Sequence, residues 1–246
     1  MISKNFYYRV YYQFNNGASR KVFYKYLIDR FFHPFNSHKK KQAANRHKRY
    51  LKTKKTSTDY FSINAFYWDS VLNKKFKDFS YLEIGSWEGN SALYVLKNFK
   101  TKGVICVDVW DKYQGLYNVG IRNQKNVKKN FKNFLFNLKE FKNKFKYHKL
   151  SSDEFFKKNK KFFDVIYIDG DHKKSQVYKD ISSAWRILNN KGLIICDDFF
   201  DGNIYKKNNK NVAAVAINRF IKKYTNEINI VSVNNNQIFF EKNKIT

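Results

Sequence analysis

Proline and cysteine are almost absent from this chain of 246 residues, which has one proline, Pro34, and two cysteines, Cys106 and Cys196. So few cysteines exclude a disulfide framework as the basis of the fold. Both cysteines lie in apolar runs that are typical of strands, so we expect buried, reduced thiols. Reduced thiols favour a cytoplasmic location, which we predict for this protein.

Long hydrophobic runs are missing as well. No run approaches the roughly 20 apolar residues of a membrane-spanning helix, and residues 1–10 lack the apolar block and the small-residue cleavage site of a signal peptide. Hydrophobic residues nevertheless make up 43% of the chain and include 25 Phe and 18 Tyr. This content and the length fit one α/β domain with an appended segment.

Acidic residues are scarce: 20 Asp and Glu stand against 49 Lys and Arg, which gives a net charge of +29. Such a charge is typical of proteins that bind nucleic acid. Only eight of the 49 basic residues are arginine, however, whereas phosphate-binding surfaces usually rely on the bidentate guanidinium. An excess of Lys and Asn with few Arg and Pro is also what an A/T-rich genome would produce. Nucleic acid is therefore a partner that the sequence allows but does not favour.

The excess of positive charge is concentrated in residues 1–58, which hold 15 Lys and Arg and one acidic residue, Asp29. We predict that these residues form a basic, aromatic N-terminal extension to a domain over residues 59–246. Within the extension, Ser19–Phe32 has the pattern of an amphipathic helix. Three interpretations stay open: a solvated tail with one packing helix, peripheral contact with an anionic membrane surface, and an arm that stacks aromatic rings on bases.

Beyond residue 58, strand-like apolar runs alternate with helical patterns. The alternation predicts an α/β fold with a Rossmann-like, doubly wound, mostly parallel seven-stranded sheet and a C-terminal antiparallel hairpin. We also expect a turn at Asn189–Gly192 and a flap over substrate at Tyr113–Gly120. The predicted strands are Ser80–Ile84, Gly103–Val107, Tyr147–Leu150, Phe162–Ile168, Leu193–Cys196, Ile228–Val233 and Gln237–Glu241, and the predicted helices are Tyr60–Leu72, Asn90–Asn98, Asn123–Leu138, Ser175–Leu188 and Asn211–Lys223.

The turn after the first predicted strand carries two glycines, Gly85 and Gly89. A dinucleotide site needs the spacing G-x-G-x-x-G. Here the spacing is G-x-x-x-G, and Trp87 stands where a second glycine would let a pyrophosphate approach the backbone. The carboxylate of Glu83, at the strand end, would repel a phosphate. It suits a cationic ligand instead, such as one that carries an ammonium group.

Acidic residues also follow the other predicted strands, where open α/β sheets bind their ligands. Asp108, after the second strand, is placed to accept hydrogen bonds from both hydroxyls of a ribose. Ser152 and Asp153, after the third, either bond an adenine ring or cap the next helix. The full set of polar strand-end residues is Glu83, Asp108, Asp153, Asp169, Asp171, His172, Asp197 and Asp198. A cationic cofactor or a metal explains so many acidic groups at one rim.

The order E-x-G-x-x-x-G-x-S over Glu83–Ser91 resembles motif I of class I S-adenosylmethionine-dependent methyltransferases. Residues 59–241 are similar to the O-methyltransferase branch of that family, which includes catechol-type and macrolide-sugar enzymes. The most specific part is Phe163–His172, continued by Asp197 and Asp198. The resemblance implies that S-adenosyl-L-methionine is bound by Glu83, Gly85, Ser86, Gly89, Ser91, Asp108, Ser152, Asp153 and Asp169.

The resemblance also implies a metal site and a general base. In the family, residues at the positions of Asp169, Asp197 and Asp198 hold Mg²⁺, which prefers hard oxygen ligands. The residue three positions after the first of these acids is the general base, here His172, so His172 and Asp169 are the predicted catalytic residues. Mg²⁺ would lower the pKa of an acceptor hydroxyl, and His172 would take its proton.

We therefore predict an S-adenosylmethionine-dependent methyltransferase that acts on a hydroxyl group of a small molecule, sugar or glycan, with possible assistance from Mg²⁺. Two alternatives stay open: an RNA methyltransferase that uses the basic surface, and a non-catalytic binding module with this fold. Enzymes that methylate the exocyclic amines of bases carry N/D-P-P-Y/F after the fourth strand, whereas this chain has Asp169–His172 there.

Overall fold

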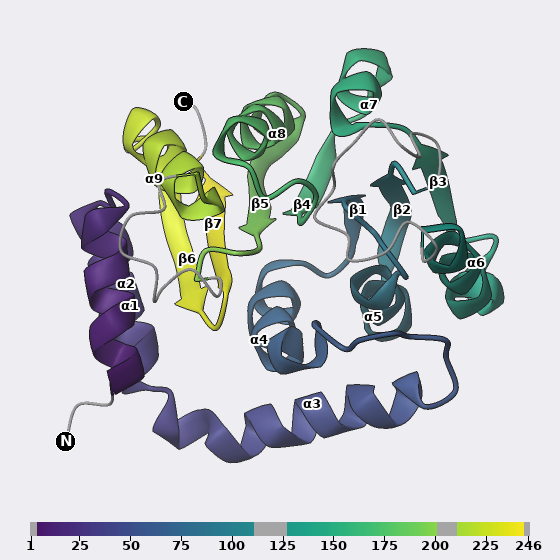
Figure 1. Cartoon of the computed structure of the whole chain (residues 1–246), viewed down its shortest axis with the longest axis horizontal. Helices are drawn as coiled ribbons and strands as arrows, with labels where there is room; N and C mark the ends of the chain where they lie inside the picture. Colours follow the sequence, from purple (N-terminus) through teal and green to yellow (C-terminus); the bar gives the residue numbers. More distant parts are fainter. Residues whose placement is uncertain (1–3, 111–126, 201–210, 244–246) are drawn as a thin grey trace. The chain divides into compact units, whose positions relative to one another are not determined.

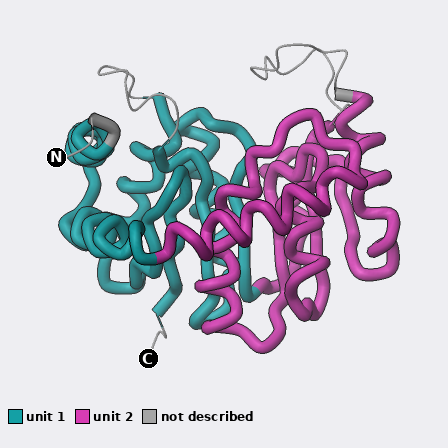
Figure 2. The backbone as a smooth tube through the Cα atoms, turned by 90° about the horizontal axis from the view of Figure 1, so that it is seen from below, with its two compact units in different colours: residues 1–35, 164–246 teal, residues 36–163 magenta. Residues whose placement is uncertain are grey.

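The computed structural model describes residues 4–110, 127–200 and 211–243 (Figure 1). It divides into two compact units (Figure 2). We call residues 36–163 the central unit, and residues 1–35 with 164–246 the terminal unit. The flap predicted at Tyr113–Gly120 lies outside the described residues.

Three parallel strands form the sheet of the central unit. They are β1 (Phe79–Ile84), β2 (Thr101–Asp108) and β3 (Phe145–Lys149), in the order β3-β2-β1. Leu82 pairs with Ile105, and Val107 pairs with His148. β1 is buried along most of its length and β2 is buried from Val104 to Val107, because both faces of a parallel sheet are covered. Their carboxyl ends therefore point in the same direction and carry Glu83 and Asp108.

The helices of the central unit begin where the sequence supplies caps. Ser151 and Glu154 form a capping box at the start of α7, in which each side chain bonds the other residue's backbone N–H. Asp59 caps the backbone N–H groups of Phe61 and Ser62, and a 3-10 turn follows, so the helix predicted from Tyr60 begins later, at Ala65. The helices are α3 (Ser37–Leu51), α4 (Ala65–Lys75), α5 (Asn90–Asn98), α6 (Val127–Leu138) and α7 (Ser152–Lys158).

The terminal unit carries the other four strands, in the order β4-β5-β7-β6. They are β4 (Phe163–Ile168), β5 (Leu188–Cys196), β6 (Ile228–Asn234) and β7 (Gln237–Lys242). β7 runs antiparallel to both neighbours, with Ile195 opposite Phe239 and Ile230 opposite Phe240. β6 and β7, the paired yellow arrows in Figure 1, are the predicted C-terminal hairpin.

One local prediction was wrong. The turn expected at Asn189–Gly192 is part of β5, which begins at Leu188. The side-chain amide of Asn189 donates to the carboxylate of Asp164 at 2.7 Å, so a residue type that favours turns is used here to bond a neighbouring segment. Lys191 does adopt a left-handed φ of +63°, which is the turn-like feature that remains.

In the part of the terminal unit that the structure describes, the α-helices are α1 (Lys4–Asn15), α2 (Arg20–Phe31), α8 (Lys174–Arg186) and α9 (Ala213–Lys223). α2 begins one residue after its N-cap, Ser19, as the pattern of residues 19–32 predicts. α8 and α9 pack through Trp185 and Phe220, whose ring centroids lie 5.6 Å apart. The division into an extension over residues 1–58 and a domain over residues 59–246 stays a prediction.

The seven strands form one mixed, mostly parallel sheet with helices on both sides, which confirms the predicted Rossmann-like α/β class. Cys106 and Cys196 are buried free thiols in β2 and β5, as predicted. Within the described residues, every helix is too short or too polar to span a bilayer. The cytoplasmic location stays a prediction.

Candidate active site

The glycine turn after β1 has the backbone that its sequence predicts. Gly85 and Gly89 have φ angles of +90° and +79°, a region that side chains disfavour. The backbone N–H of Gly85 donates to the carbonyl of Val107 at 2.8 Å, which ties the turn to β2. A Cβ atom at Gly89 would lie 2.9 Å from atoms of both Phe134 and Leu138. Gly89 is therefore required both for its φ and for close packing between α5 and α6.

Glu83 is fully buried at the end of β1. The hydroxyl of Tyr81 donates to its Oε2 at 2.6 Å, whereas its Oε1 has no hydrogen-bond partner among the residues that the structure describes. Burial raises the pKa of Glu83 to about 7, although the hydroxyls of Tyr81, Ser91 and Ser86 oppose the rise. A buried carboxylate oxygen without a donor is costly. It is an acceptor placed for a ligand that brings a donor, preferably a cationic one.

Asp108 holds the glycine turn in place. Its two carboxylate oxygens accept backbone hydrogen bonds from Trp87 and Trp110, both at 2.8 Å. The indole N–H of Trp110 donates to the carbonyl of Trp87 at 2.7 Å. Burial raises the pKa of Asp108, and the backbone donors oppose that rise. Further backbone donors from Val109 and Ser86 also engage this carboxylate, and the ribose contact of Asp108 stays a prediction.

Ser152 and Asp153 are in the first turn of α7, but neither caps the helix. The capping pair consists of their neighbours Ser151 and Glu154. Ser152 is half-buried and Asp153 is exposed. The capping explanation therefore applies to the adjacent residues, and the predicted adenine contact of Ser152 and Asp153 stays a prediction.

A buried polar bridge beside the turn was not predicted. Glu88, within the glycine motif, accepts hydrogen bonds from the backbone N–H of Ser57 at 2.6 Å and from the side-chain amide of Asn133 at 2.7 Å. Asn137 donates to the carbonyls of Glu88 and Lys55 at 2.9 and 3.0 Å. Glu88 therefore anchors the segment before α4 and the helix α6 to the turn. Because Glu88 lies between the two glycines, its position in the sequence suggests a residue that faces a ligand. The sequence contains no signal that distinguishes such a ligand-binding role from this structural one.

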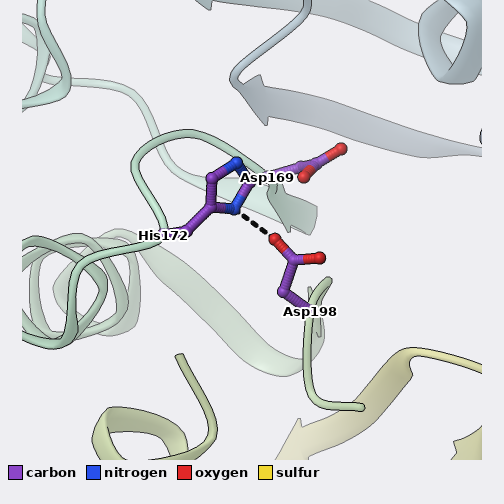
Figure 3. A group of neighbouring side chains, drawn as sticks. All are labelled: Asp169, His172 and Asp198. Atoms are coloured by element: carbon purple, nitrogen blue, oxygen red, sulfur yellow. Dashed lines mark ion pairs between the residues drawn. The ribbon is translucent and has the colours of Figure 1, made fainter. Parts of the chain in front are cut away.

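The terminal unit brings a second group of polar side chains together. Ligand atoms of Asp169, His172 and Asp198 all lie within 4.8 Å of one another (Figure 3). Nδ1 of His172 forms a close ion pair with Oδ2 of Asp198. The hydrogen bond to Asp198 raises the pKa of His172, and partial burial opposes the rise. The imidazole is nevertheless 67% exposed, so a substrate can reach it.

Asp197 is held differently. Its carboxylate accepts hydrogen bonds from the hydroxyl of Tyr167 at 2.5 Å and from the side-chain amide of Gln237 at 2.9 Å, and its other oxygen accepts from the backbone N–H of Asp198 at 2.8 Å. Burial raises its pKa, and the charge of Asp198 adds to the rise. The group whose ligand atoms lie together thus contains His172 where the sequence predicts Asp197.

The residues of this group can hold a divalent cation. Asp169 and Asp198 offer carboxylate oxygens and His172 offers a ring nitrogen, and with Gly170 they line a small recess. Oxygen donors suit Mg²⁺, and a nitrogen donor is better suited to transition metals such as Mn²⁺ or Zn²⁺. Asp198 has a φ of +56°, a strained backbone that is common at functional sites.

The seven-stranded sheet, the glycine turn after β1 and the acidic strand ends define a class I methyltransferase architecture. Residues 82–199 match the family model described as a methyltransferase domain, and this range contains every predicted site residue. The chain therefore carries a methyltransferase domain, as the sequence resemblance implies.

The chain is similar in sequence to one curated relative and in fold to two solved structures. It is 30% identical over 128 residues to the uncharacterized protein R132 of Acanthamoeba polyphaga mimivirus; the match covers 50% of this chain and 53% of that protein, about half of its length. The O-methyltransferase TomG from Streptomyces achromogenes, in complex with SAM, superposes with a TM-score of 0.54 at 12% identity, covering 91% of this chain and 99% of TomG.

The second structure is the MycE methyltransferase from the mycinamycin biosynthetic pathway, in complex with Mg and SAH. It matches with a TM-score of 0.53 at 14% identity and covers 82% of this chain and 54% of MycE. At these levels of identity, the two structures show a shared fold.

Proposed function

We propose that this protein is an S-adenosyl-L-methionine-dependent O-methyltransferase that acts on a hydroxyl group of a small molecule, sugar or glycan. The observation that carries the proposal is the buried carboxylate of Glu83, whose Oε1 has no partner among the described residues. A methyltransferase domain needs a methyl donor, and S-adenosyl-L-methionine offers an ammonium group that can donate to such an oxygen. TomG, which shares the fold, was solved with SAM.

The glycine turn supplies the rest of the proposed cofactor contacts. The positive φ angles of Gly85 and Gly89 let the backbone approach a ligand closely. Ser86 is buried, and its hydroxyl lies close enough to Glu83 to oppose the rise of that pKa. Asp108, at the end of β2, is proposed to contact the ribose. Bound cofactor would supply the methyl group, held at its aminoacyl end by Glu83 and Ser86.

The group in the terminal unit is proposed to prepare the acceptor hydroxyl. His172 would take the proton, because its imidazole is accessible and lies against a carboxylate that stabilises the protonated ring. Asp169, Asp197 and Asp198 would hold a divalent cation, which supplies Lewis-acid activation when bound, and His172 would stay free of the cation to act as the base. MycE, solved with Mg, supports this assignment by shared fold.

The acceptor class is proposed from the same group. An acceptor with two neighbouring oxygens suits a site of carboxylates and a cation, whereas an exocyclic amine needs no cation. RNA methylation is less favoured because the basic residues are mostly lysine, with few arginines.

The proposal is tested by transfer of a radiolabelled methyl group from S-adenosyl-L-methionine to a panel of catechols, sugars and short RNAs. We expect label on a hydroxyl compound, loss of transfer with a chelator and recovery with Mg²⁺ or Mn²⁺. Label on RNA alone would contradict the acceptor class. Transfer that is unaffected by the chelator would contradict the metal assignment but leave the cofactor assignment intact.

A further inference from the structure

The helical hairpin α1–α2 is tied firmly to the terminal unit through one face. Oδ2 of Asp29 accepts hydrogen bonds from the backbone N–H of Val233 at 2.7 Å and from the hydroxyl of Ser232 at 3.1 Å, both on β6. Val22 and Tyr26 of α2 are buried on the same unit. α2 therefore covers part of β6, the last strand in the order of the sheet.

Three more hydrogen bonds hold the hairpin. Arg9 donates to the carbonyl of Asn235 at 2.8 Å, Lys21 donates to the carbonyl of Thr225 at 2.9 Å, and Asn218 donates to the carbonyl of Asn16 at 3.0 Å. They reach from α1, from the turn and from α2 to the C-terminal part of the chain. The hairpin is thus an integral part of the terminal unit, and hydrogen bonds fix its inner face.

Its outer face is aromatic and exposed. On α1, Tyr7, Tyr11 and Phe14 are 40–63% exposed, and on α2, Tyr24, Ile28 and Phe31 are 51–68% exposed. Both triplets have the spacing i, i+4, i+7, which places each on one face of its helix. A stripe with this spacing normally faces the core. We call these six residues the aromatic face.

The aromatic face continues past the end of α2. The rings of Phe31, Phe32 and Phe35 lie within 5.3–6.4 Å of one another, centroid to centroid, and Phe35 is 74% exposed. Phe14 on α1 contacts Phe23 on α2 at 4.8 Å, so the two helices are joined at their turn-side ends. An apolar surface of this extent is unusual for a protein that leaves it in water, and it marks an interaction site.

The charges of the hairpin decide the kind of partner. Residues 6–35 contain five basic residues and one acidic residue, Asp29, which bonds to β6 and pairs with Lys25. Arg20 and Arg30 are exposed. Two copies of this face would bring like charges together, which disfavours self-association. The aromatic face also contains the aliphatic Ile28, and its continuation past α2 adds Phe32 and Phe35, so it presents non-polar side chains that suit an acyl environment.

We propose that the aromatic face docks on an anionic lipid surface. Phe31, Phe32 and Phe35 would enter the boundary between headgroups and acyl chains, the tyrosines would sit at the headgroup level, and Arg20 and Arg30 would contact lipid phosphates. The proposal is independent of the enzymatic function. It adds that the protein would work at a membrane surface, whether or not the membrane also holds the acceptor.

The test is flotation of the full-length protein with vesicles of phosphatidylcholine alone or with about 30 mol% phosphatidylserine. We expect binding to the anionic vesicles and little to the neutral ones. The double variant Phe31→Ser/Phe35→Ser should lower the partition coefficient by at least about tenfold, since each phenyl ring loses its burial in the interface. Arg20→Gln/Arg30→Gln should weaken binding by about fivefold to thirtyfold and reduce its dependence on salt.

Matched controls separate this surface from the general charge of the chain. Phe162→Ser removes a phenylalanine that is 59% exposed in the central unit, and Lys157→Gln/Lys158→Gln removes two positive charges from the end of α7. Both should bind anionic vesicles like the unchanged protein. Full binding by Phe31→Ser/Phe35→Ser would overturn the proposal, because attraction would then be electrostatic alone.

Two other results would also overturn the proposal. One is absence of binding to anionic vesicles. The other is evidence that the same face binds a different partner. RNA binding is measured by fluorescence anisotropy, and concentration-dependent dimerisation is measured by light scattering. Loss of either one in Phe31→Ser/Phe35→Ser, with vesicle binding retained, would give that result. Circular dichroism and thermal unfolding of each variant confirm that the fold is kept, which the exposure of Phe31 and Phe35 predicts.

Discussion

The same short pattern occurs on β1 and on β4: a tyrosine, one intervening residue and a carboxylate. Residues i and i+2 of a strand point to the same face, and the hydroxyl of Tyr81 donates to Glu83 at 2.6 Å. The hydroxyl of Tyr167 lies 3.0 Å from Asp169, the residue directly after β4, and 2.5 Å from Asp197, so the two acids share this donor. Burial then makes the two sites different. Glu83 is fully buried, whereas Asp169 is only partly buried and is grouped with Asp198 and an exposed imidazole.

This difference in burial shows how one fold can contain two kinds of acidic site. A single buried carboxylate with an open acceptor position binds one cationic group in a fixed place. A cluster of partly exposed carboxylates with an imidazole can hold a cation and move a proton. The proposed function therefore places cofactor binding in the central unit and acceptor activation in the terminal unit, and each prediction below tests that proposal.

The largest expected effect is at His172. His172→Ala should lower turnover by about 10²–10⁴-fold, because a general base is lost, while the affinity for S-adenosyl-L-methionine stays within about twofold of the unchanged protein. Steady-state kinetics and calorimetry measure the two quantities. His38→Ala, an exposed histidine on α3 that bonds Gln42, is the matched control and should leave both unchanged. Normal turnover by His172→Ala would show that His172 is not the general base.

The pKa of Glu83 predicts a pH dependence of stability. Burial raises this pKa from 4.5 to about 7, so between these values the folded protein binds a proton that the unfolded chain releases. Stability from this group is therefore present below about pH 4.5 and lost as the pH rises through about 7, a change of roughly 3 kcal/mol. The measurement is urea unfolding at pH 5 and pH 8 of the unchanged protein and of Glu83→Gln without cofactor. Relative to the unchanged protein, Glu83→Gln should have a higher free energy of unfolding at pH 8 than at pH 5. If the difference in free energy of unfolding between the two proteins is the same at both pH values, Glu83 is not buried as described.

Gly89 tests whether the central site depends on packing. Gly89→Ala should destabilise the fold by about 2 kcal/mol, because its φ is +79° and a Cβ would meet Phe134 and Leu138 at 2.9 Å. Gly103→Ala is the control, since no described atom lies within 4 Å of the added Cβ, and its effect should be below about 0.5 kcal/mol. Equal effects in chemical denaturation would contradict the packing role of Gly89.

The smallest effects compare the two tyrosines directly. Tyr81→Phe removes a donor from a carboxylate that is fully buried, so we expect a loss of about 1–3 kcal/mol of stability at pH 8. Tyr167→Phe removes a donor from carboxylates that are partly exposed, and Asp197 keeps its bond from Gln237, so we expect a loss of about 1 kcal/mol or less. Thermal unfolding measures both, and a larger loss at Tyr167 would reverse the contrast.

Much of the fold and part of the site could be predicted from the sequence. The strands at 79–84, 101–108 and 163–168 are mainly apolar and have an acid at or directly after their carboxyl ends, and this pattern places Glu83, Asp108 and Asp169 there. The start of β5 was missed because Asn189 and Gly192 are typical turn residues. There the hydrogen bond from Asn189 to Asp164 uses a contact between distant segments, which no local pattern shows.

The partners of the acids were harder to predict. Tyr81 and Tyr167 could have been found from the i, i+2 spacing on their strands, but tyrosines in apolar runs look like core residues. Gln237 bonds Asp197 across 40 positions of the sequence, so no local signal identifies it. The same holds for the pairing of His172 with Asp198, which depends on how two separate turns meet within the terminal unit.

The division between the two acidic sites is tested most directly by calorimetric titration of S-adenosyl-L-methionine at pH 8 into the unchanged protein, Glu83→Gln and Asp198→Asn. Loss of a charged, buried acceptor should weaken binding by about 10–100-fold in Glu83→Gln, whereas Asp198→Asn should bind within about twofold of the unchanged protein. No binding to the unchanged protein at millimolar ligand, or equal losses in the two variants, would contradict the assignment of cofactor binding to the central unit.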